Sequence, residues 1–563
     1  MNRAQSSRLP LLALILSTCV LVATTWHYYG HTWDEPEHLA AGMELLDHGG
    51  YEYDLQHPPI ARLLIALGPY LDGARSQGTP PPDGRPEGLA ILYGRGNYSR
   101  DLALARLGAL PFLALLLAAT WVWGRQLMSP GTALLATALV ASSPPILGHA
   151  GLATLDVAAA GTCLLALYAL QAWFAGGTLR QAIAVGFACG VAIGTKLSAI
   201  PFLAVGIVVL GAATWLQTRT DAGRLLPSRH GGWRTIGHAT AGFAVACAVL
   251  TVAYGGRFIY FTDAAHRYDQ ALTYLFGQSG FGHDVAYAVA ARVPLPKAFH
   301  LLIGGIQALA VHNQSGHLSF LLGETRTSGW WYFYIVALAV KLPLPLLGLG
   351  LPGLARLAVV GWRERSVWLV SPPLLFIAIL GFCCAVSRIN VGVRHVLILV
   401  PLLALGAASL VQVLARSLAA ARSRRSLVAG FAALGALLTW QLITLVRTYP
   451  DYLAYFNETV RHPERVLVDS DLDWGQDLKR LEQRLAELGA RHVALGYLGT
   501  TDLGREPLPP FTVLEPGRPA QGWVAITALA RVRDPQGYAW LATYRPLERI
   551  GKTVDLYWIP VTR

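Results

Sequence analysis

The stretch that decides the fold is LLALILSTCVLVATTW, residues 11–26, followed four residues later by HTWDEPEH, residues 31–38. The first stretch is apolar and comes after Arg3 and Arg8, so it resembles a secretory signal peptide. It lacks a clear small-x-small cleavage site before polar sequence, and many apolar stretches of similar length follow it. We therefore interpret it as a retained signal-anchor helix that begins a polytopic membrane protein.

The composition supports a chain that lies largely in lipid. Of its 563 residues, 54% are hydrophobic and only 14% are charged, whereas soluble domains usually carry about 25% charged residues. The net charge of +12 would suit a nucleic-acid partner, but the arginines gather in short loops between apolar stretches, as shown next. This placement indicates that the basic charge follows the membrane topology, so we expect no nucleic-acid partner. No G-x-x-x-x-G-K-[ST] loop or dinucleotide fingerprint is present, so we do not expect ATP-driven transport by this chain alone.

Eleven apolar stretches approach the roughly 20 residues that a membrane span needs. They are residues 11–27, 103–124, 132–148, 156–174, 181–198, 200–216, 238–254, 331–351, 367–386, 393–414 and 426–446. A twelfth, Phe299 to Val311, is too short and is interpreted as re-entrant or interfacial. With the N-terminus inside, the inside loops hold 15 arginines but only Asp221 and Glu364 as acids. The positive-inside rule then places the loop of residues 28–102 and the C-terminus outside.

The composition changes near Tyr449, where a small α/β domain is predicted. The helix expected over residues 474–488 places four leucines on one face and ends at Gly489 as its C-cap. Strands are predicted at residues 465–469, 493–498, 523–529 and 554–560. We therefore expect an all-α transmembrane module over residues 1–448 and an extracytoplasmic α/β domain over residues 449–563.

The first outside loop is predicted to hold two amphipathic helices that lie on the membrane surface. One begins beside Asp34 and Glu35, and the other begins at His57-Pro58-Pro59. These helices would hold Asp34, Glu35 and His57 at the lipid–water boundary. Paired carboxylates there can act as a general base and as a positioner of an acceptor hydroxyl. The alternative is that both acids only occupy a helix N-terminus, where the helix dipole favours them.

Two charged residues lie within or beside predicted spans. Asp156 is at the outer end of the fourth span, and Lys196 is at the outer turn between the fifth and sixth spans. A charged side chain at the centre of a span costs about 2.5–3.5 kcal/mol on insertion scales, so such residues are candidates for a functional site. Snorkelling to the nearby surface is the alternative explanation for both.

Three further clusters fall outside in this topology. In the first, aromatic residues typical of an interfacial belt lead to Lys341-Leu-Pro343. In the second, Arg394 could grip a phosphate while His395 donates beside it, although a loop with a satisfied arginine would look the same. The third is the acidic stretch Asp469–Asp477, where helix capping explains the acids without a cation, and cation binding stays open.

The order of these motifs resembles a known family. The set is Asp34-Glu35, His57-Pro58-Pro59, Thr154-x-Asp156, Gly194-Thr195-Lys196, Lys341-x-Pro343, Asn390-x-Gly392-x-Arg394-His395 and Asp469-Ser-x-Leu-Asp473-Trp-Gly-Gln476-Asp477. Together they resemble bacterial phospholipid-carrier-dependent glycosyltransferases of the GT-C superfamily, which are relatives of the protein O-mannosyltransferases and of the aminoarabinose transferase of lipid A. The resemblance extends from the first span to about Leu498. One departure is Asp471, where the family pattern has asparagine.

The resemblance implies an inverting transfer from a polyprenyl-phosphate-linked sugar donor to an extracytoplasmic acceptor, which is a glycan, lipid or protein hydroxyl. It implies a multi-pass protein of the bacterial inner membrane, with a cytoplasmic N-terminus. Asp34 becomes the general base and Glu35 its support. From position or from the resemblance, the residues expected to bind substrate are His57, Asp156, Lys196, Lys341, Arg394 and His395. No cofactor is certain, no metal ligand is assigned, and a divalent cation at the Asp34-Glu35 pair stays open.

Two other functions fit some of these features. A secondary transporter or lipid flippase would explain charge inside the membrane, but no inverted repeat or pair of broken helices is visible in the sequence. A non-catalytic assembly subunit could use the same scaffold, and the Asp34-Glu35 pair counts against it. The sequence names neither the sugar nor the acceptor.

Overall fold

The computed structural model describes residues 8–81, 83–219, 232–259, 275–277, 279–420 and 423–560. Arg3 and Asp221, which the charge count uses, lie outside these described residues. The chain divides into two compact units. The first unit holds Met1–Pro36, Leu110–Val157 and Gly316–Arg563, and the second holds Glu37–Ala109 and Ala158–Ser315. Residues 449–560 belong to the first unit, and their independence as a domain stays a prediction.

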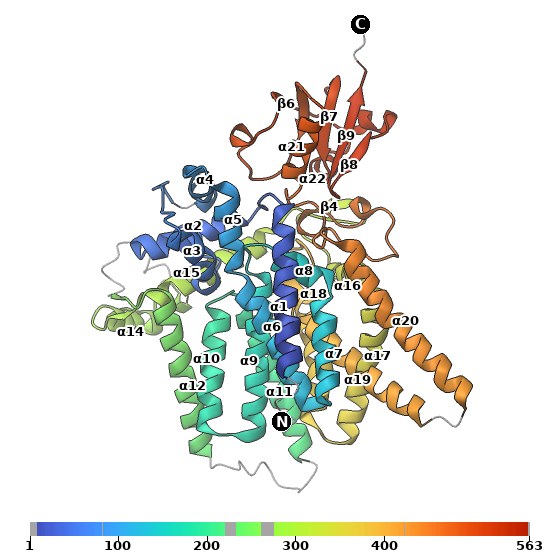
Figure 1. The fold of residues 1–563 in the computed structure, drawn as a ribbon. Helices are drawn as coiled ribbons and strands as arrows, with labels where there is room; N and C mark the ends of the chain where they lie inside the picture. The colour runs from blue at the N-terminus through green and yellow to red at the C-terminus, as the bar shows by residue number, and fades with distance from the viewer. Residues whose placement is uncertain are drawn as a thin grey trace. The chain divides into compact units, whose positions relative to one another are not determined.

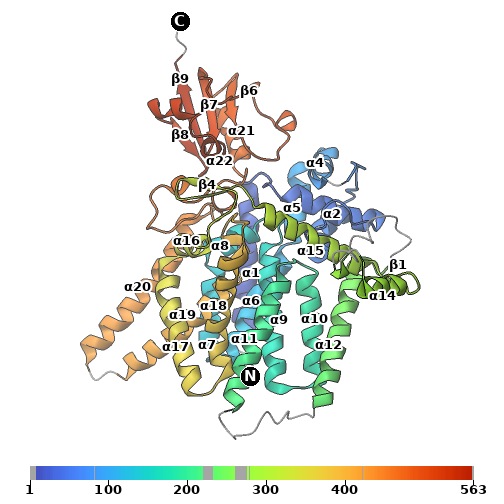
Figure 2. The same ribbon diagram turned by 180° about the vertical axis from the view of Figure 1, so that it is seen from behind.

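Long apolar helices dominate the first unit. Its membrane-associated helices, long and short, are α1 (Arg8–Thr24), α6 (Leu110–Leu127), α7 (Pro130–Ala141), α8 (Pro144–Ala150), α16 (Phe333–Lys341), α17 (Leu344–Arg363), α18 (Val367–Val386), α19 (Leu399–Ala419) and α20 (Arg424–Thr448). Helix α1 begins at the end of this unit that lies away from the C-terminal sheet (Figure 1). The short helices α8 and α16 lie at the end near the sheet in both views (Figures 1 and 2).

Glycines set the closest helix contact of this unit, between α17 and α19. A Cβ atom on Gly353 would lie 2.0 Å from the carbonyl oxygen of Gly406, and one on Gly350 would lie 2.4 Å from Cγ of Leu403. Lipid supplies no hydrophobic drive for helix association, so helices in a membrane gain from backbones that approach closely. The glycines therefore fix how α17 and α19 pack.

The second unit combines apolar helices with shorter helices near their ends. Its elements are α2 (Glu35–His48), α3 (Pro59–Leu71), α4 (Gly84–Gly94), α5 (Tyr98–Leu107), α9 (Asp156–Gly176), α10 (Leu179–Ile193), α11 (Ala199–Arg219), α12 (Gly232–Ala253), β1 (Phe258–Ile259), α14 (Phe281–Ala290), β2 (Leu295–Pro296) and α15 (Lys297–Ser315). Helices α2 and α9 begin on residues of the first unit. Helices α9, α10 and α12 stand side by side (Figures 1 and 2).

The helices predicted for the first outside loop are present as α2 and α3. Helix α15 covers the stretch from Phe299 to Val311 that was predicted not to span, and it lies across the ends of the apolar helices of its unit (Figure 2). At Gly305, a Cβ atom would lie 2.2 Å from the carbonyl oxygen of Leu55. This close approach fixes α15 against the loop before α3.

Each of the eleven predicted spans overlaps a helix, but not all of these helices are long enough to cross a membrane. The predicted span of residues 331–351 is divided between two helices, because α16 ends at Lys341 and the long apolar helix α17 covers Leu344–Arg363. Within the described residues, nine helical stretches are long and apolar enough, and the pair α7 and α8, bent by 64°, would make a tenth. The bend falls at Pro144 and Pro145, which begin α8, because proline cannot donate the backbone hydrogen bond that would continue α7. The predicted span of residues 181–198 is shorter than expected, since α10 ends at Ile193. The fold class is that of a multi-pass membrane protein, as predicted.

A five-stranded sheet forms the C-terminal part of the first unit, in the order β6-β5-β7-β9-β8. The strands are β5 (Val493–Gly496), β6 (Phe511–Val513), β7 (Gly522–Thr527), β8 (Glu548–Ile550) and β9 (Val554–Ile559). Strand β5 pairs in parallel with β6 and β7, and β9 pairs antiparallel with β7 and β8. Helix α21 (Leu478–Glu487) buries Leu478, Leu481 and Leu485 against one face, as its leucine spacing predicts.

The strand predicted at residues 465–469 is wrong. The chain there forms two 3-10 turns, Pro463–Arg465 and Asp469–Asp471. Asp469 has a φ of +57°, a left-handed conformation that a strand does not accommodate. The apolar run that suggested a strand is buried, with Leu467 1% and Val468 5% exposed, but in an irregular segment that contacts the loop before α19. A small hairpin, β3 (Ser319–Leu321) and β4 (Glu324–Arg326), also belongs to this unit.

The glycine contact between α17 and α19 gives a first prediction. We expect Gly353→Val to destabilise the protein by about 1–3 kcal/mol, because the added methyl groups force two packed backbones apart. Gly348→Val on the same helix is the matched control, since a Cβ atom there meets nothing within 4 Å. Thermal unfolding of both variants in the same detergent measures the difference. Equal melting temperatures for the two variants would contradict this account of the packing.

Candidate active site

Three charged side chains of the first unit meet at the ends of its apolar helices. Nη1 of Arg394 lies 2.6 Å from Oδ2 of Asp34 and 3.8 Å from Oδ2 of Asp156. Asp34 immediately precedes α2, Asp156 begins α9, and Arg394 lies in the short 3-10 turn Val393–Val396 before α19. Arg394 and Asp34 are 360 residues apart in sequence. The fold thus gathers three residues that the sequence singled out separately.

The charge of Arg394 is supported on several sides. Its guanidinium carbon lies 4.4 Å from the centre of the Trp474 ring, within the range of a cation–π contact. Burial works against a charged guanidinium, but Asp34 and then Asp156 outweigh it and hold the pKa of Arg394 above its ordinary value. Arg394 is therefore a cation in the folded protein, because its carboxylate neighbours offset the cost of removing its charge from water.

The acidic turn of residues 469–477 holds the loop that carries Arg394. The amide of Val393 donates to Oδ1 of Asp471 at 3.1 Å, and the Ser470 hydroxyl donates to the carbonyl of Val391. Between them, Gly392 has a φ of +132°, and a Cβ atom there would lie 2.5 Å from Oγ of Ser470. Only glycine fits this approach without strain, which explains the glycine between Asn390 and Arg394.

Lys341 holds the same acidic turn through hydrogen bonds to main-chain carbonyls. Its Nζ donates to the carbonyl of Leu453 at 2.9 Å and to the carbonyl of Asp471 at 2.5 Å, and the residue is 1% exposed. Nζ also lies 4.4 Å from the centre of the Phe456 ring. These bonds favour a role in holding the acidic turn over the predicted contact with a departing phosphate, because the ammonium group is already committed to main-chain oxygens.

Glu35 differs from Asp34 in what surrounds it. One of its carboxylate oxygens accepts from the amide and hydroxyl of Thr32, at 2.8 and 3.1 Å, and the other accepts from the amide of Ala153 at 2.7 Å. The residue is 1% exposed, whereas the side chain of Asp34 is 22% exposed. Glu35 therefore ties the loop before α2 to the segment before Asp156, and Asp34 is the carboxylate of the pair that a substrate can reach.

The segment before Asp34 also pairs with the acidic stretch. The amide of Gly30 donates to the carbonyl of Gln476 at 3.0 Å, and the amide of Trp33 donates to the carbonyl of Trp474 at 3.2 Å. Trp33 also packs beside Trp474 in a small apolar cluster. The two bonds fix the backbone that leads into Asp34.

The remaining acids of the stretch have structural partners. Asp473 accepts from the amides of Leu529 and Gly475, at 2.7 and 3.2 Å. Oδ2 of Asp477 accepts from the amide of Lys552 and the hydroxyl of Thr553, both at 3.0 Å. Within the described residues, no group of three or more His, Cys, Asp or Glu side chains is placed to hold a metal ion.

His395 was expected to donate to a phosphate beside Arg394, but its ring contacts Tyr334. Its Nδ1 lies 3.1 Å from the hydroxyl of Tyr334, and this hydroxyl donates to the carbonyl of Ile389 at 2.9 Å. The histidine thereby ties the turn that carries Arg394 to helix α16. Its predicted role in binding substrate stays a prediction.

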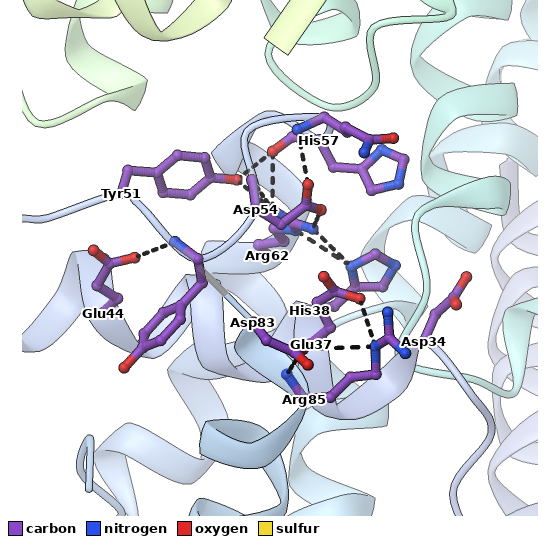
Figure 3. Close-up of polar contacts among 12 residues, drawn as sticks. Asp34, Glu37, His38, Glu44, Tyr51, Asp54, His57, Arg62, Asp83 and Arg85 are labelled. Atoms are coloured by element: carbon purple, nitrogen blue, oxygen red, sulfur yellow. Dashed lines mark hydrogen bonds and ion pairs between the residues drawn. The ribbon is translucent and has the colours of Figure 1, made fainter. Parts of the chain in front are cut away.

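The second unit has its own buried charged cluster, built around Arg62 (Figure 3). The Arg62 guanidinium donates to the carboxylate of Asp54 and to Nδ1 of His38, and Nη1 also donates to the carbonyl of His57 at 3.0 Å. The hydroxyl of Tyr51 donates to the same carbonyl at 2.5 Å. Arg62 is 0% exposed, and its charge holds the pKa of Asp54 below the usual range against the opposing effect of burial. The cluster fixes the backbone at His57.

The structure brings the His57 and Lys196 motifs together within this unit. The amide of Ile60, in the first turn of α3, donates to the carbonyl of Gly194 at 2.8 Å. A Cβ atom on Gly194 would lie 2.6 Å from Cδ1 of Ile60. Lys196 follows two residues later, half-buried in the turn between α10 and α11. The glycine of the Gly-Thr-Lys motif thus contacts Ile60, the residue that directly follows His57-Pro58-Pro59.

Two residues of these sites were missed by sequence reasoning. Trp474 was noticed only as part of a motif, and nothing in its sequence neighbourhood predicts a contact with Arg394. Arg62 had a usable signal, because a lone arginine among apolar residues of an amphipathic helix must be paired or must mark a site.

The buried carboxyl of Asp473 gives a prediction on pH. Burial raises the pKa of Asp473 to about 7, whereas an unfolded aspartate titrates near 3.9. Between these values the folded protein keeps a proton that the unfolded chain has released, so stability falls as pH rises from about 4 to about 7. The slope from this group is at most about 1.4 kcal/mol per pH unit.

Melting temperatures of the wild type and of Asp473→Asn, measured from about pH 4.5 to pH 7.5, test this effect. Asparagine does not titrate but keeps an oxygen for the amide of Leu529. We expect the wild type to lose stability relative to the variant as pH rises. Parallel curves for the two proteins would show that Asp473 is charged in the folded state across this range.

The first part of the chain matches a known family. Residues 12–259 match the family model described as dolichyl-phosphate-mannose-protein mannosyltransferase, and no curated protein matches the sequence. The matched segment contains Asp34, His57, Asp156 and Lys196. Over this part of the chain, the match supports the predicted resemblance to the protein O-mannosyltransferases.

Three solved structures are similar to the chain at low sequence identity. The ArnT protein of Cupriavidus metallidurans, bound to undecaprenyl phosphate, is 13% identical over 97% of both chains, with a TM-score of 0.49. The oligosaccharyltransferase AglB of Archaeoglobus fulgidus, bound to an inhibitory peptide and a dolichol-phosphate, is 13% identical, with a TM-score of 0.46; the match covers 77% of this chain and 55% of AglB, about half its length. The Pmt1-Pmt2 complex of S. cerevisiae, bound to its sugar donor, is 17% identical over 44% of this chain and 33% of the other, with a TM-score of 0.32.

Proposed function

We propose that this chain, a multi-pass membrane protein related to the GT-C glycosyltransferases, transfers a sugar from a polyprenyl-phosphate carrier to a hydroxyl of an extracytoplasmic acceptor. The observation that carries the proposal is the contact of Arg394 with Asp34 and Asp156, at 2.6 and 3.8 Å. It supplies a reachable carboxylate and a fixed guanidinium side by side, next to the ends of apolar helices. A transfer from a lipid phosphate to a hydroxyl needs these two groups, one to take a proton and one to meet the charge of the phosphate.

Each group has one task in the proposed reaction. Asp34 accepts the proton of the acceptor hydroxyl, whose oxygen forms a bond to the anomeric carbon of the sugar. The bond from that carbon to the carrier phosphate breaks, and the polyprenyl phosphate leaves with the electron pair. Arg394 neutralises the departing phosphate through its planar guanidinium. Asp156 helps to orient Arg394, and Glu35 fixes the backbone that carries Asp34.

Other predicted residues take supporting places in the proposal. Lys341 acts through the acidic turn, because its ammonium group is bonded to main-chain oxygens. His57 and Lys196 stay proposed substrate-binding residues of the second unit, where their motifs are docked on each other. The sugar and the acceptor are left open by the groups described.

The base assignment predicts the effect of Asp34→Asn. Purified protein in lipid nanodiscs, supplied with a polyprenyl-phosphate sugar and an envelope fraction as the acceptor, should lose about 10²–10⁴-fold in transfer rate, because asparagine cannot accept the proton. Glu324→Gln is the control, as it removes an equally negative side chain that is 62% exposed on β4. Full transfer by Asp34→Asn would remove Asp34 from the role of base.

We also propose an orientation, with the N-terminus in the cytoplasm and the C-terminal sheet outside, in the bacterial inner membrane. The inside loops of this topology carry the arginines, as the positive-inside rule requires, and the start of α1 and the C-terminal sheet lie at opposite ends of the first unit (Figure 1). A reporter enzyme that is active only outside the cytoplasm, fused after Arg563, should be active. Activity of a cytoplasm-only reporter at the same position would reverse the topology and move the proposed acceptor to the other side.

A further inference from the structure

The proposed base and the proposed phosphate ligand are each other's partners. Oδ2 of Asp34 lies 2.6 Å from Nη1 of Arg394, so each partly neutralises the charge that the other would use in the reaction. Resting on the proposed function, we propose that Asp34 and the phosphate of the donor compete for Arg394, so that phosphate binding releases Asp34 to accept a proton. Arg394 then couples occupation of the donor site to activation of the base.

The charge balance around Arg394 favours an exchange of partners. Its guanidinium faces Asp34 and Asp156 directly, and the charge of Asp469 also acts on it. One cation thus serves several carboxylates, with Arg533 reaching Asp469 at 3.7 Å. Within the described part of the chain, Nε of Arg394 is buried without a hydrogen-bond partner. A phosphate oxygen would give this donor the acceptor that it lacks.

The geometry also indicates which of the two carboxylates, Asp34 or Asp156, a phosphate would displace from Arg394. The Trp474 ring, 4.4 Å from the guanidinium carbon, and the clamped backbone at Val393 hold Arg394 in place. The side chain of Asp156 is 1% exposed and 3.8 Å away, whereas that of Asp34 is 22% exposed. Asp34 is therefore the anion that can leave, while Arg394 and Asp156 stay. A guanidinium also binds phosphate through two parallel hydrogen bonds, which strengthens the exchange.

Linkage makes the coupling measurable from either side. If loss of the charge on Asp34 strengthens phosphate binding by some factor, then phosphate binding raises the proton affinity of Asp34 by the same factor. The competition therefore predicts an unusual outcome. A substitution that abolishes transfer should improve binding of the phosphate-bearing product, whereas simple damage to the site would weaken it.

The experiment measures the affinity of the full chain in nanodiscs for polyprenyl phosphate, which lacks a sugar and cannot react. We expect Asp34→Asn to bind it roughly three- to tenfold more tightly than the wild type, as expected for a partly exposed ion pair that no longer competes. Asp156→Asn should give a smaller gain, because its oxygen lies farther from Arg394. Arg394→Gln should bind several-fold more weakly than the wild type.

Two controls separate this effect from others. Polyprenol without phosphate should bind equally to the wild type and to Asp34→Asn, and a similar gain for polyprenol would overturn the competition. Glu324→Gln removes a charge far from Arg394 in sequence and exposed on β4, and a gain of equal size there would attribute the effect to net charge. If Asp34→Asn unfolds, Asp34→Ala, which also removes the competing carboxylate, carries the test.

The result that overturns the inference is a wild type that binds polyprenyl phosphate while a folded Asp34→Asn variant binds it no more tightly. That result leaves the proposed function in place, provided that the wild type transfers sugar. A wild type that neither binds polyprenyl phosphate nor transfers sugar would instead contradict the proposed function itself.

Discussion

The ion pair between Arg394 and Asp34 joins segments 360 residues apart, and much of the first unit is arranged to hold it. A guanidinium beside apolar helices needs counter-charges and fixed hydrogen bonds, because removing an unpaired charge from water costs several kcal/mol. The acidic turn supplies that fixation by clamping Val393 and Val391, and Lys341 fastens the turn in its place. The C-terminal segment therefore contributes directly to the geometry at Arg394.

The same constraint divides the acidic residues by task. Three of them, Glu35, Asp473 and Asp477, accept hydrogen bonds from backbone amides. These hydrogen bonds join segments of the chain that are distant in sequence. Asp34 differs because its partner is the side chain of Arg394, which is also the phosphate ligand of the proposed reaction. A carboxylate that must accept a proton has to be reachable and only loosely held, and this difference separates Asp34 from Glu35, its neighbour in sequence.

Buried charge organises the second unit in a similar way. Arg62 is surrounded by Asp54, His38 and main-chain carbonyls, and it fixes the backbone at His57. A buried arginine of this kind is strongly destabilising when its partner is removed. Its hydrogen bonds offset the cost of burial and hold the loop before α3, and the Gly194 turn contacts Ile60 in the first turn of that helix. In both units, then, an arginine paired with carboxylates lies at a loop that carries predicted site residues.

The sequence by itself determined the multi-pass class, the helices of the first outside loop and the helix and three strands near the C-terminus, because apolar length and periodicity are local properties. It also singled out Asp34, Asp156 and Arg394, since charge and motif order can be seen without a fold. Only the tertiary structure decided that these three meet, that Lys341 bonds to carbonyls, and that residues 465–469 turn instead of forming a strand. Contacts across hundreds of residues depend on packing, and no local pattern around Arg394 or Asp34 encodes the partner that each one finds.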